Sequence, residues 1–473
     1  MEQEEKKISQ QWRKRLEEIG QDAYEFEEMT RLGFLGEKKV TEMIKASGIT
    51  LEEYEKAKVK LSDISRSLNE TTKEIESIGS VQEALEKIRA QRIKRTKEKN
   101  KARKLKKEAQ LKERRKLIHE QQINCPTFLG RDVSNRLNFS GGNAQENELK
   151  GVPFISSFLE LSSALNLKPE TLQWLVYERD SAKIDHYTRF EIPKRTGGRR
   201  LISSPKPSLR RAQKWILDSM LNKLDTHSAA MAFRPKLSIL DNAKLHANSK
   251  VVVRMDIKDF FPSITFARIR GFFESLGYNP GVSTVLSLIC TDSPRVTLKH
   301  LGETYFVKVG SRNLPQGACT SPALANLIAN KLDRRLQKYT QKVNWVYSRY
   351  ADDLIFSSNT ESMPPYRLIK AVSMIVGDEG FIVNKKKTSI MRSPHRQVVT
   401  GLVVNKDVRI SRKDLRRFRA FFHRCETQGL TNVSNDLGKD ALSMAKGFLA
   451  YISMISPDLG TKISQKHLWI SSQ

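Results

Sequence analysis

Long apolar runs, a secretory leader and paired cysteines are all missing from this 473-residue sequence. No run of about 18 or more apolar residues occurs, so the sequence predicts no membrane-spanning helix. The first seven residues, M-E-Q-E-E-K-K, lack the basic-then-apolar order of a signal peptide. The four cysteines, at positions 125, 290, 319 and 425, are far apart and form no C-x-x-C pair. We therefore expect a cytoplasmic protein with reduced thiols, and neither a zinc site nor a disulfide framework.

Acidic residues are scarce relative to basic ones. The chain has 83 Lys and Arg against 53 Asp and Glu, which gives a formal net charge of +30 and a pI near 9.9. Like charges repel one another in a compact fold, so an excess of this size indicates a polyanionic partner. Nucleic acid and an anionic membrane surface are the two candidates, and the lack of a spanning segment favours nucleic acid. The length is sufficient for two or three domains with a large core.

The first 120 residues contain no proline and few aromatic residues. Residues 50–53 fit a capping box, and apolar residues then follow at alternating three- and four-residue steps as far as residue 68. This spacing predicts an amphipathic helix whose stripe suits a short coiled coil. A second capping box at 80–83 predicts a long helix that ends near residue 120.

Basic residues concentrate in the segment 91–118, which holds 14 Lys and Arg and 3 Asp and Glu. One interpretation is a solvated helix face or a disordered tail, and the other is an arm that binds RNA. The like charges surround the whole helix, and phosphates would relieve their repulsion. We therefore favour the RNA-binding arm. Recruitment of a partner protein and association of two copies of the chain stay open for this region.

The middle of the chain changes from helical to mixed patterns. Residues 139–151 include S-G-G-N and predict a flexible connection. A pair of helices is expected at 153–179, with Pro169 in the first turn of the second. Strands and helices alternate from about residue 186, and a basic helical pattern returns after about residue 405.

Three aspartates lie next to apolar segments that are expected to be buried strands, where a charged carboxylate is costly. Asp256 follows the β-branched run 251–253, and Asp352 and Asp353 lie between two apolar strands of a predicted hairpin. Taken singly, Asp256 suits a helix cap and the Asp pair suits a solvated turn. Taken together, three carboxylates from two strands suit two magnesium ions about 3.5–4 Å apart, the arrangement that nucleotidyl transfer requires.

Between these segments, residues 314–322 read L-P-Q-G-A-C-T-S-P. The glycine predicts a turn, and Ser321 is expected to cap a helix whose first residue is Pro322. Such a turn leaves backbone groups and Gln316 free beside the active strands.

In this order, the three segments resemble the palm motifs of reverse transcriptases, namely R-x-D-x-x-x-F, L-P-Q-G-x-x-x-S-P and Y-A-D-D. Residues 192–202 resemble the fingers motif, which implies that Arg200 and Lys194 meet the incoming triphosphate. Residues 380–388 resemble the next palm motif, in which a Gly precedes a strand and a Lys follows it. Phe261 stands where relatives place the aromatic residue that blocks a ribose 2′-hydroxyl, although ordinary core packing is the alternative. Gln316 is implied as a template and nucleotide contact.

Two short signatures narrow the resemblance to bacterial retron-type reverse transcriptases with a long N-terminal extension. Residues 242–246 match N-A-x-x-H, and residues 399–401 match V-T-G. The resemblance covers about residues 155–470. It implies an α+β right-hand fold with fingers, a palm containing a small antiparallel sheet and a helical thumb, preceded by a helical N-terminal region. The expected divisions are a helical extension over 1–120, a connection with a helical pair over 121–180, fingers and palm over 181–398, and a thumb over 399–473.

The resemblance implies an RNA-directed DNA polymerase that uses deoxynucleotides and two Mg²⁺ ions, with Asp256, Asp352 and Asp353 as catalytic metal ligands. It implies a structured noncoding RNA as partner, priming from a 2′-hydroxyl, a branched RNA–DNA product and a role in antiphage defence with an effector protein. RNA contacts are expected at Asn242, His246, Thr400, Gly401, Arg412, Arg416 and Arg419. For His246 a buried structural role is an equal alternative. For the three arginines, which have helix-facing spacing, a solvated face is the alternative.

Two other functions stay open. A different bacterial reverse transcriptase, of the group II intron or defence-associated kind, would lack the N-A-x-x-H and V-T-G signatures. An RNA-binding scaffold without catalysis would be expected to lack at least one of the three aspartates.

Overall fold

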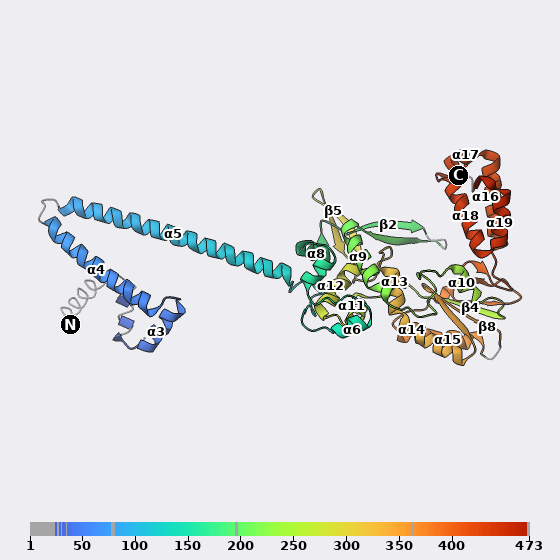
Figure 1. Cartoon of the computed structure of the whole chain (residues 1–473), viewed down its shortest axis with the longest axis horizontal. Coiled ribbons are helices and arrows are strands. Elements are labelled where there is room, and N and C mark those ends of the chain that lie inside the picture. The colour runs from blue at the N-terminus through green and yellow to red at the C-terminus, as the bar shows by residue number, and fades with distance from the viewer. Residues whose placement is uncertain are drawn as a thin grey trace. The chain divides into compact units, whose positions relative to one another are not determined.

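The computed structural model describes residues 24–25, 28–29, 31–34, 36–76, 81–193, 197–360 and 363–470. The chain divides into two units, Met1–Arg114 and Arg115–Gln473, and each has its own architecture (Figure 1). None of the helices in the described ranges has the length and apolarity needed to cross a membrane.

The first unit is helical throughout its described parts. It contains α3 (Glu37–Ala46), α4 (Leu51–Glu76) and most of α5 (Val81–Asn124). The first predicted capping box is confirmed, because Thr50 Oγ1 accepts from the Glu53 N–H at 3.3 Å and the Glu53 carboxylate accepts from the Thr50 N–H at 2.9 Å. The second capping box begins at a residue outside the described ranges. No described side chain of this unit is buried, so its described part has no core of its own.

Short helices open the second unit. They are α6 (Ala144–Leu149), α7 (Phe158–Ala164) and α8 (Pro169–Val176), so the predicted helical pair and its Pro169 start are confirmed. The flexible connection predicted for 139–151 is wrong. Asn143 caps α6 by accepting from the Glu146 N–H, and its own N–H donates to the Gly277 carbonyl at 2.7 Å. The Gly, Ser and Asn residues of this segment therefore form an ordered helix cap and allow the backbone to approach Gly277 closely.

Two small antiparallel sheets follow. The hairpin of β2 (Tyr187–Pro193) and β3 (Arg199–Pro205) carries the predicted fingers motif. The other sheet has the order β1-β6-β5. Its strands are β1 (Ser181–Ala182), β5 (Arg295–His300) and β6 (Glu303–Lys308).

A four-stranded antiparallel sheet, which we call the palm sheet, has the order β7-β8-β4-β9. Its strands are β4 (Val251–Asp256), β7 (Val346–Tyr350), β8 (Asp353–Ser358) and β9 (Ser389–Arg392). The predicted buried strand at 251–253 and the predicted hairpin are confirmed. Because successive side chains of a strand point to opposite faces of the sheet, Val253 of β4 packs in the largest core and Val252 packs in a second cluster on the other face.

Helices occupy most of the remaining described chain between residues 207 and 387. They are α9 (Pro207–Ser219), α10 (Ile239–Lys244), α11 (Phe266–Ser275), α12 (Pro280–Cys290), α13 (Ser321–Ile328), α14 (Asn330–Lys342) and α15 (Pro365–Asp378), with 3₁₀ turns η1 (Leu221–Lys223) and η2 (Lys385–Lys387). Helix α13 starts one residue earlier than expected. Ser321 is inside it, and its hydroxyl donates to the Pro315 carbonyl at 2.7 Å. The predicted Ser321 cap is therefore wrong, because that hydroxyl braces the preceding loop.

The C-terminal part is a helical bundle, drawn in orange to red in Figure 1. The short hairpin β10 (Val398–Val399) and β11 (Leu402–Val403) leads into α16 (Arg412–Gln428), α17 (Leu430–Leu437), α18 (Ala441–Ile455), α19 (Pro457–Lys466) and η3 (Leu468–Ile470). Phe418 and Phe422 of α16 pack against Ile452 of α18 in the bundle core. Ile455 of α18 reaches the cluster of Val252, which joins the bundle to the palm sheet. The predicted α+β architecture is thus confirmed.

Candidate active site

The register of the palm sheet brings the three predicted aspartates to one end. Asp256 is the last residue of β4, Asp353 is the first of β8, and the two are paired across the strands. Asp352 lies in the tight turn between β7 and β8, and its carbonyl accepts from the Ile257 N–H at 2.9 Å. Ala351 completes this turn at a φ of 56°, a conformation that is costly for a residue with a side chain. The turn therefore fixes the Asp pair opposite Asp256.

This end of the sheet carries more buried negative charge than the protein compensates. Burial raises the pKa of Asp353 to about 6, and repulsion from Asp352 and Asp256 adds to the shift. Burial, with a contribution from Asp256, also raises the pKa of Asp352. A cation placed among these carboxylates would stabilise their charged forms and would therefore lower the pKa values of Asp352 and Asp353.

Asp256 has two further partners. Its Oδ2 accepts from Lys387 Nζ at 2.9 Å, and its Oδ1 accepts from Asn384 Nδ2 at 3.0 Å. Lys387 ends η2, which lies within the predicted Gly-strand-Lys motif at 380–388. The expected strand of that motif is reduced to a single bridge between Val383 and Ile257. The lysine run was visible in the sequence, but the pattern did not show which lysine reaches the site.

Within the described residues no group of three or more His, Cys, Asp and Glu side chains is already arranged around a common metal position. The donors nevertheless fit a hard divalent cation, since the three carboxylates offer oxygen ligands without sulfur or imidazole. The raised pKa values of Asp352 and Asp353 fit it as well. Lys387 and Asn384 together hold the Asp256 carboxylate, and Lys387 is the one that carries a positive charge.

A hollow beside this end contains two of the predicted nucleotide contacts, Arg200 of β3 and Gln316. The Gln316 carbonyl accepts from the Ser203 N–H at 2.7 Å, which ties the loop to β3. Gly317 allows this approach at a φ of 117°, because a Cβ there would lie 2.9 Å from the Ser203 carbonyl oxygen. Arg189 of β2 also lines the hollow, although no sequence motif singles it out.

Arg189 is held by a buried acid. Its Nη1 lies 2.8 Å from Asp292 Oδ2. Burial raises the pKa of Asp292 to about 6 even though Arg189 and Arg312 oppose that shift. No sequence pattern links residues 103 positions apart, so only the fold reveals this pair.

The other two predicted nucleotide contacts are Lys194 and Phe261. Lys194 lies outside the described residues. Phe261 is half-buried, with its ring centroid 5.6 Å from that of Phe260 and 6.3 Å from that of Phe233. Phe260 fills the core instead, at 3% exposure. Of the two phenylalanines, Phe260 is therefore a core residue and Phe261 is a partly exposed one.

The predicted RNA contacts at Asn242 and His246 are wrong for this conformation. Both side chains are 0% exposed. His246 Nδ1 and Nε2 lie 2.8 and 2.7 Å from the hydroxyls of Ser357 and Ser348. The Ser348 hydroxyl donates to Asn242 Oδ1 at 2.7 Å. Burial lowers the pKa of His246 to about 3, so the imidazole is neutral. Its hydrogen bonds connect the segment that follows α10 to strands β7 and β8.

The remaining predicted RNA contacts have available surface. Gly401 is exposed in the β10–β11 turn, and the Thr400 hydroxyl donates to the Ile239 carbonyl at 3.1 Å. Arg412, Arg416 and Arg419 are exposed on α16 at four- and three-residue steps. Such spacing puts the three guanidinium groups on one side of the helix, away from its buried phenylalanines.

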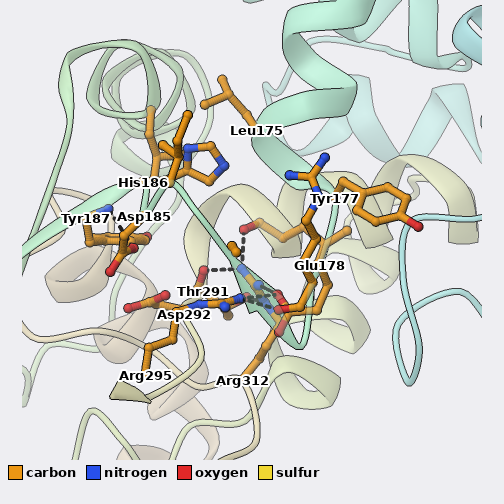
Figure 2. A pocket seen from close by; sticks show the side chains of 15 residues that line it. Leu175, Tyr177, Glu178, Asp185, His186, Tyr187, Thr291, Asp292, Arg295 and Arg312 are labelled. Carbon is orange, nitrogen blue, oxygen red and sulfur yellow. Dashed lines mark hydrogen bonds and ion pairs between the residues drawn. The ribbon is translucent and has the colours of Figure 1, made fainter. Parts of the chain in front are cut away.

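A second hollow, shown in Figure 2, is lined by charged groups that pair with one another. The buried Glu178 carboxylate accepts from Ser293 Oγ at 2.6 Å and from Arg312. Burial alone would raise the pKa of Glu178, but Arg312 with Ser293 and neighbouring cations lowers it overall. Arg312 also donates to the Leu288 carbonyl at 2.8 Å. These contacts anchor the segment just before the Gln316 loop, which gives the network a structural role.

Comparisons with known proteins point to one family. The family model described as "Reverse transcriptase (RNA-dependent DNA polymerase)" matches residues 192–410. The Retron Mx162 reverse transcriptase of Myxococcus xanthus is 39% identical over 325 residues, which cover 66% of this chain and 66% of that protein. The Retron Mx65 reverse transcriptase of the same organism is 35% identical, with 67% and 72% covered. The Retron Ec86 reverse transcriptase of Escherichia coli is 36% identical, with 58% and 79% covered.

Proposed function

Because the chain belongs to the reverse transcriptases of bacterial retrons, which are RNA-directed DNA polymerases, we propose that it copies part of a structured noncoding RNA into single-stranded DNA. Synthesis starts from a 2′-hydroxyl of a guanosine in that RNA, so the product is a branched RNA–DNA hybrid. The product serves antiphage defence together with an effector protein. The two signatures at 242–246 and 399–401 support this choice over other bacterial reverse transcriptases.

In this proposal Asp256, Asp352 and Asp353 hold two Mg²⁺ ions. When bound, the ions activate the attacking hydroxyl and stabilise the leaving pyrophosphate. The chain itself fixes the three carboxylates by strand register and by the tight turn at Ala351. Lys387, now paired with Asp256, would be released if that carboxylate held a cation, and its ammonium group would then be available to a phosphate of the substrate.

The incoming deoxynucleotide lies in the hollow beside the three aspartates. Arg200 neutralises its triphosphate, and Gln316 contacts the nucleotide from the opposite loop. Lys194, which the fingers motif also implies, adds a second positive charge. Phe261 presents its partly exposed ring to the sugar and excludes a 2′-hydroxyl. Arg189, positioned by Asp292, adds positive charge to the same hollow.

The RNA stem or RNA–DNA duplex lies along the thumb. Arg412, Arg416 and Arg419 offer three guanidinium groups to its phosphates, and A-form helices are recognised mainly through backbone and shape. Thr400 and Gly401 approach the nucleic acid at the base of the thumb. Asn242 and His246 support this region from within the palm.

The observation that carries the proposal is the convergence of the three aspartates at one end of the palm sheet, within the matched family segment. The test is to express the chain with its neighbouring genomic sequence and to isolate the copurifying nucleic acid. Wild type is compared with Asp352→Ala/Asp353→Ala and with the exposed control Asp407→Ala. We expect a short single-stranded DNA joined to RNA, present in wild type and control, absent in the double variant and released by debranching enzyme.

Other outcomes separate the alternatives. A linear complementary DNA would retain the polymerase and reject the branched product. If no protein yields DNA while all retain RNA, the scaffold function is favoured instead.

A further inference from the structure

Helix α5 carries a dense run of exposed basic side chains. In its segment 91–118, 14 Lys and Arg stand against 3 Asp and Glu, and every one of these side chains is exposed. At 1.5 Å per residue these 28 residues extend over about 42 Å. Within the described part of α5 a single ion pair, Lys116 with Glu120 at 4.0 Å, offsets this charge. The remaining cations repel one another along the helix.

The apolar residues of α5 do not form a stripe. Ile93, Leu105, Leu111 and Leu117 are all about half-exposed. At 100° per residue, Leu105 and Leu117 point about 120° to either side of Ile93 and Leu111. A coiled-coil seam needs apolar residues every 3.5 positions, and a membrane-surface helix needs one apolar face. The apolar residues of α5 are scattered around the helix. Neither a coiled-coil partner nor a membrane surface is therefore the main binding partner of this exposed helix.

Charge without an apolar face indicates a polyanion, and the lack of aromatic residues indicates which kind. Residues 81–124 contain no Phe, Tyr or Trp. Proteins that bind single strands usually stack bases on aromatic rings. Double-stranded RNA is held instead through phosphates and 2′-hydroxyls and by its shape. A straight helix with cations on every side suits a rigid phosphate backbone.

We propose that α5 is an arm that binds the phosphates of a double-stranded RNA stem. The proposal deepens the proposed function and rests on it, since it supplies a second contact for a structured RNA outside the polymerase core. The arm acts by charge, so its binding is independent of sequence and sensitive to salt.

The test uses the full chain and a plain RNA duplex of about 20 base pairs, longer than the roughly 16 base pairs that a double-stranded RNA-binding domain spans. The arm variant carries Lys94→Gln, Lys97→Gln, Lys101→Gln and Lys104→Gln. The control carries four Lys→Gln changes at the exposed positions Lys45, Lys56, Lys60 and Lys73 of α3 and α4. Both variants lose four charges and keep good helix-forming residues. Fluorescence anisotropy gives the dissociation constant at several salt concentrations.

We expect the arm variant to bind the duplex at least about tenfold more weakly at low salt. Its plot of log affinity against log salt should be shallower by about 2 to 4, because each lost phosphate contact removes about 0.9 from the slope. The control should match wild type in both quantities. Equal binding by arm variant and control overturns the proposal. Equal losses for single-stranded RNA and duplex, or a loss confined to anionic phosphatidylserine vesicles, overturn it as well.

Failure of the arm and failure of the proposed function are distinguishable. If wild type yields the branched DNA while the arm variant binds duplex like the control, the arm alone is rejected. If wild type yields no DNA but the arm variant loses duplex binding, the arm stands and the proposed function fails.

Discussion

The guanidinium of Arg349 and the carboxylate of Asp333 form a fully buried, bidentate ion pair immediately before the turn that carries Asp352. The two contacts measure 2.6 and 2.8 Å, and both side chains are 0% exposed. Arg349 also donates to Asn326 Oδ1 at 3.0 Å and to the Ala351 carbonyl at 3.3 Å. Burial alone would lower the pKa of Arg349, but Asp333 raises it overall. The pair therefore joins α13, α14 and β7 to the strained residue that orients the Asp pair.

Breaking this pair should cost both stability and catalysis. Asp333→Asn leaves a buried, uncompensated guanidinium, and we expect a loss of about 3–5 kcal/mol in unfolding free energy. Below its unfolding midpoint, the folded variant should extend a primer at least about tenfold more slowly, with the dNTP KM nearly unchanged, because a small misplacement of catalytic groups is costly. Denaturant unfolding and primer extension measure the two effects. The exposed pair Asp407–Arg409 provides the control, Asp407→Asn, which should change neither. A variant with normal activity would show that Arg349 does not orient the turn.

Lys387 should compete with magnesium for Asp256. Lys387→Ala removes an ammonium 2.9 Å from the carboxylate, so cations should bind there more readily. We expect the half-saturating magnesium concentration to fall, while the maximal rate of primer extension falls by about tenfold or more because a cation is lost near the substrate phosphates. Lys385→Ala and Lys386→Ala, from the same run, should leave the magnesium dependence unchanged. An identical magnesium curve for Lys387→Ala and wild type contradicts the competition.

Phe261 should select deoxynucleotides. Its ring has free surface, whereas the neighbouring Phe260 is buried, so only Phe261 can meet a sugar. Phe261→Val should raise the incorporation of ribonucleotides relative to deoxynucleotides by at least about tenfold, the effect of roughly 1.4 kcal/mol of relieved clash. Competition assays with matched dNTP and NTP pairs measure the ratio. Phe260→Leu should leave the ratio unchanged, and an equal change in both variants would mean that the effect comes from core packing.

His246 should affect stability with a defined dependence on pH. Its pKa is lowered to about 3 in the folded chain and is about 6.5 when unfolded, so its stabilising contribution is complete above pH 6.5 and is lost as the pH falls. His246→Gln should cost about 1–3 kcal/mol at pH 7.5. This cost should shrink by about 1.4 kcal/mol for each pH unit below 6.5, because wild type weakens there. Denaturant unfolding at pH 7.5 and 5.5 measures both values. A large loss of RNA affinity at pH 7.5 without loss of stability would restore the RNA-contact interpretation.

Local patterns predicted much of this fold. Three consecutive valines predicted β4, and two apolar segments around an Asp pair predicted the hairpin of β7 and β8. These features depend on a few neighbouring residues and on burial of both faces of the sheet. The capping box at Thr50 and the Pro169 helix start are likewise local. Once the two strands are known, their pairing brings Asp256 opposite Asp353.

What the sequence did not reveal depends on distant contacts. Lys387 lies 131 residues from Asp256, and Arg312 lies 134 residues from Glu178. No spacing rule connects such positions, because their proximity comes from the packing of several helices and sheets. His246 shows the same limit. Its burial follows from a network with Ser348 and Ser357, both more than 100 residues further along the chain.

The three aspartates are the metal ligands of the proposed mechanism, and single substitutions test that role most directly. Asp256→Asn, Asp352→Asn and Asp353→Asn keep the size of each side chain but remove its charge. Purified variants are assayed for primer extension on an RNA template with magnesium, and for RNA affinity and unfolding midpoint. We predict that each variant loses at least about 1,000-fold in rate, in line with the loss of a main electrostatic contribution to catalysis. RNA affinity should be unchanged, and the midpoint of Asp353→Asn should not fall, because a destabilised buried charge is removed. Any of the three variants that retains more than about a tenth of the wild-type rate, only about 1.4 kcal/mol of lost transition-state stabilisation, would contradict the account.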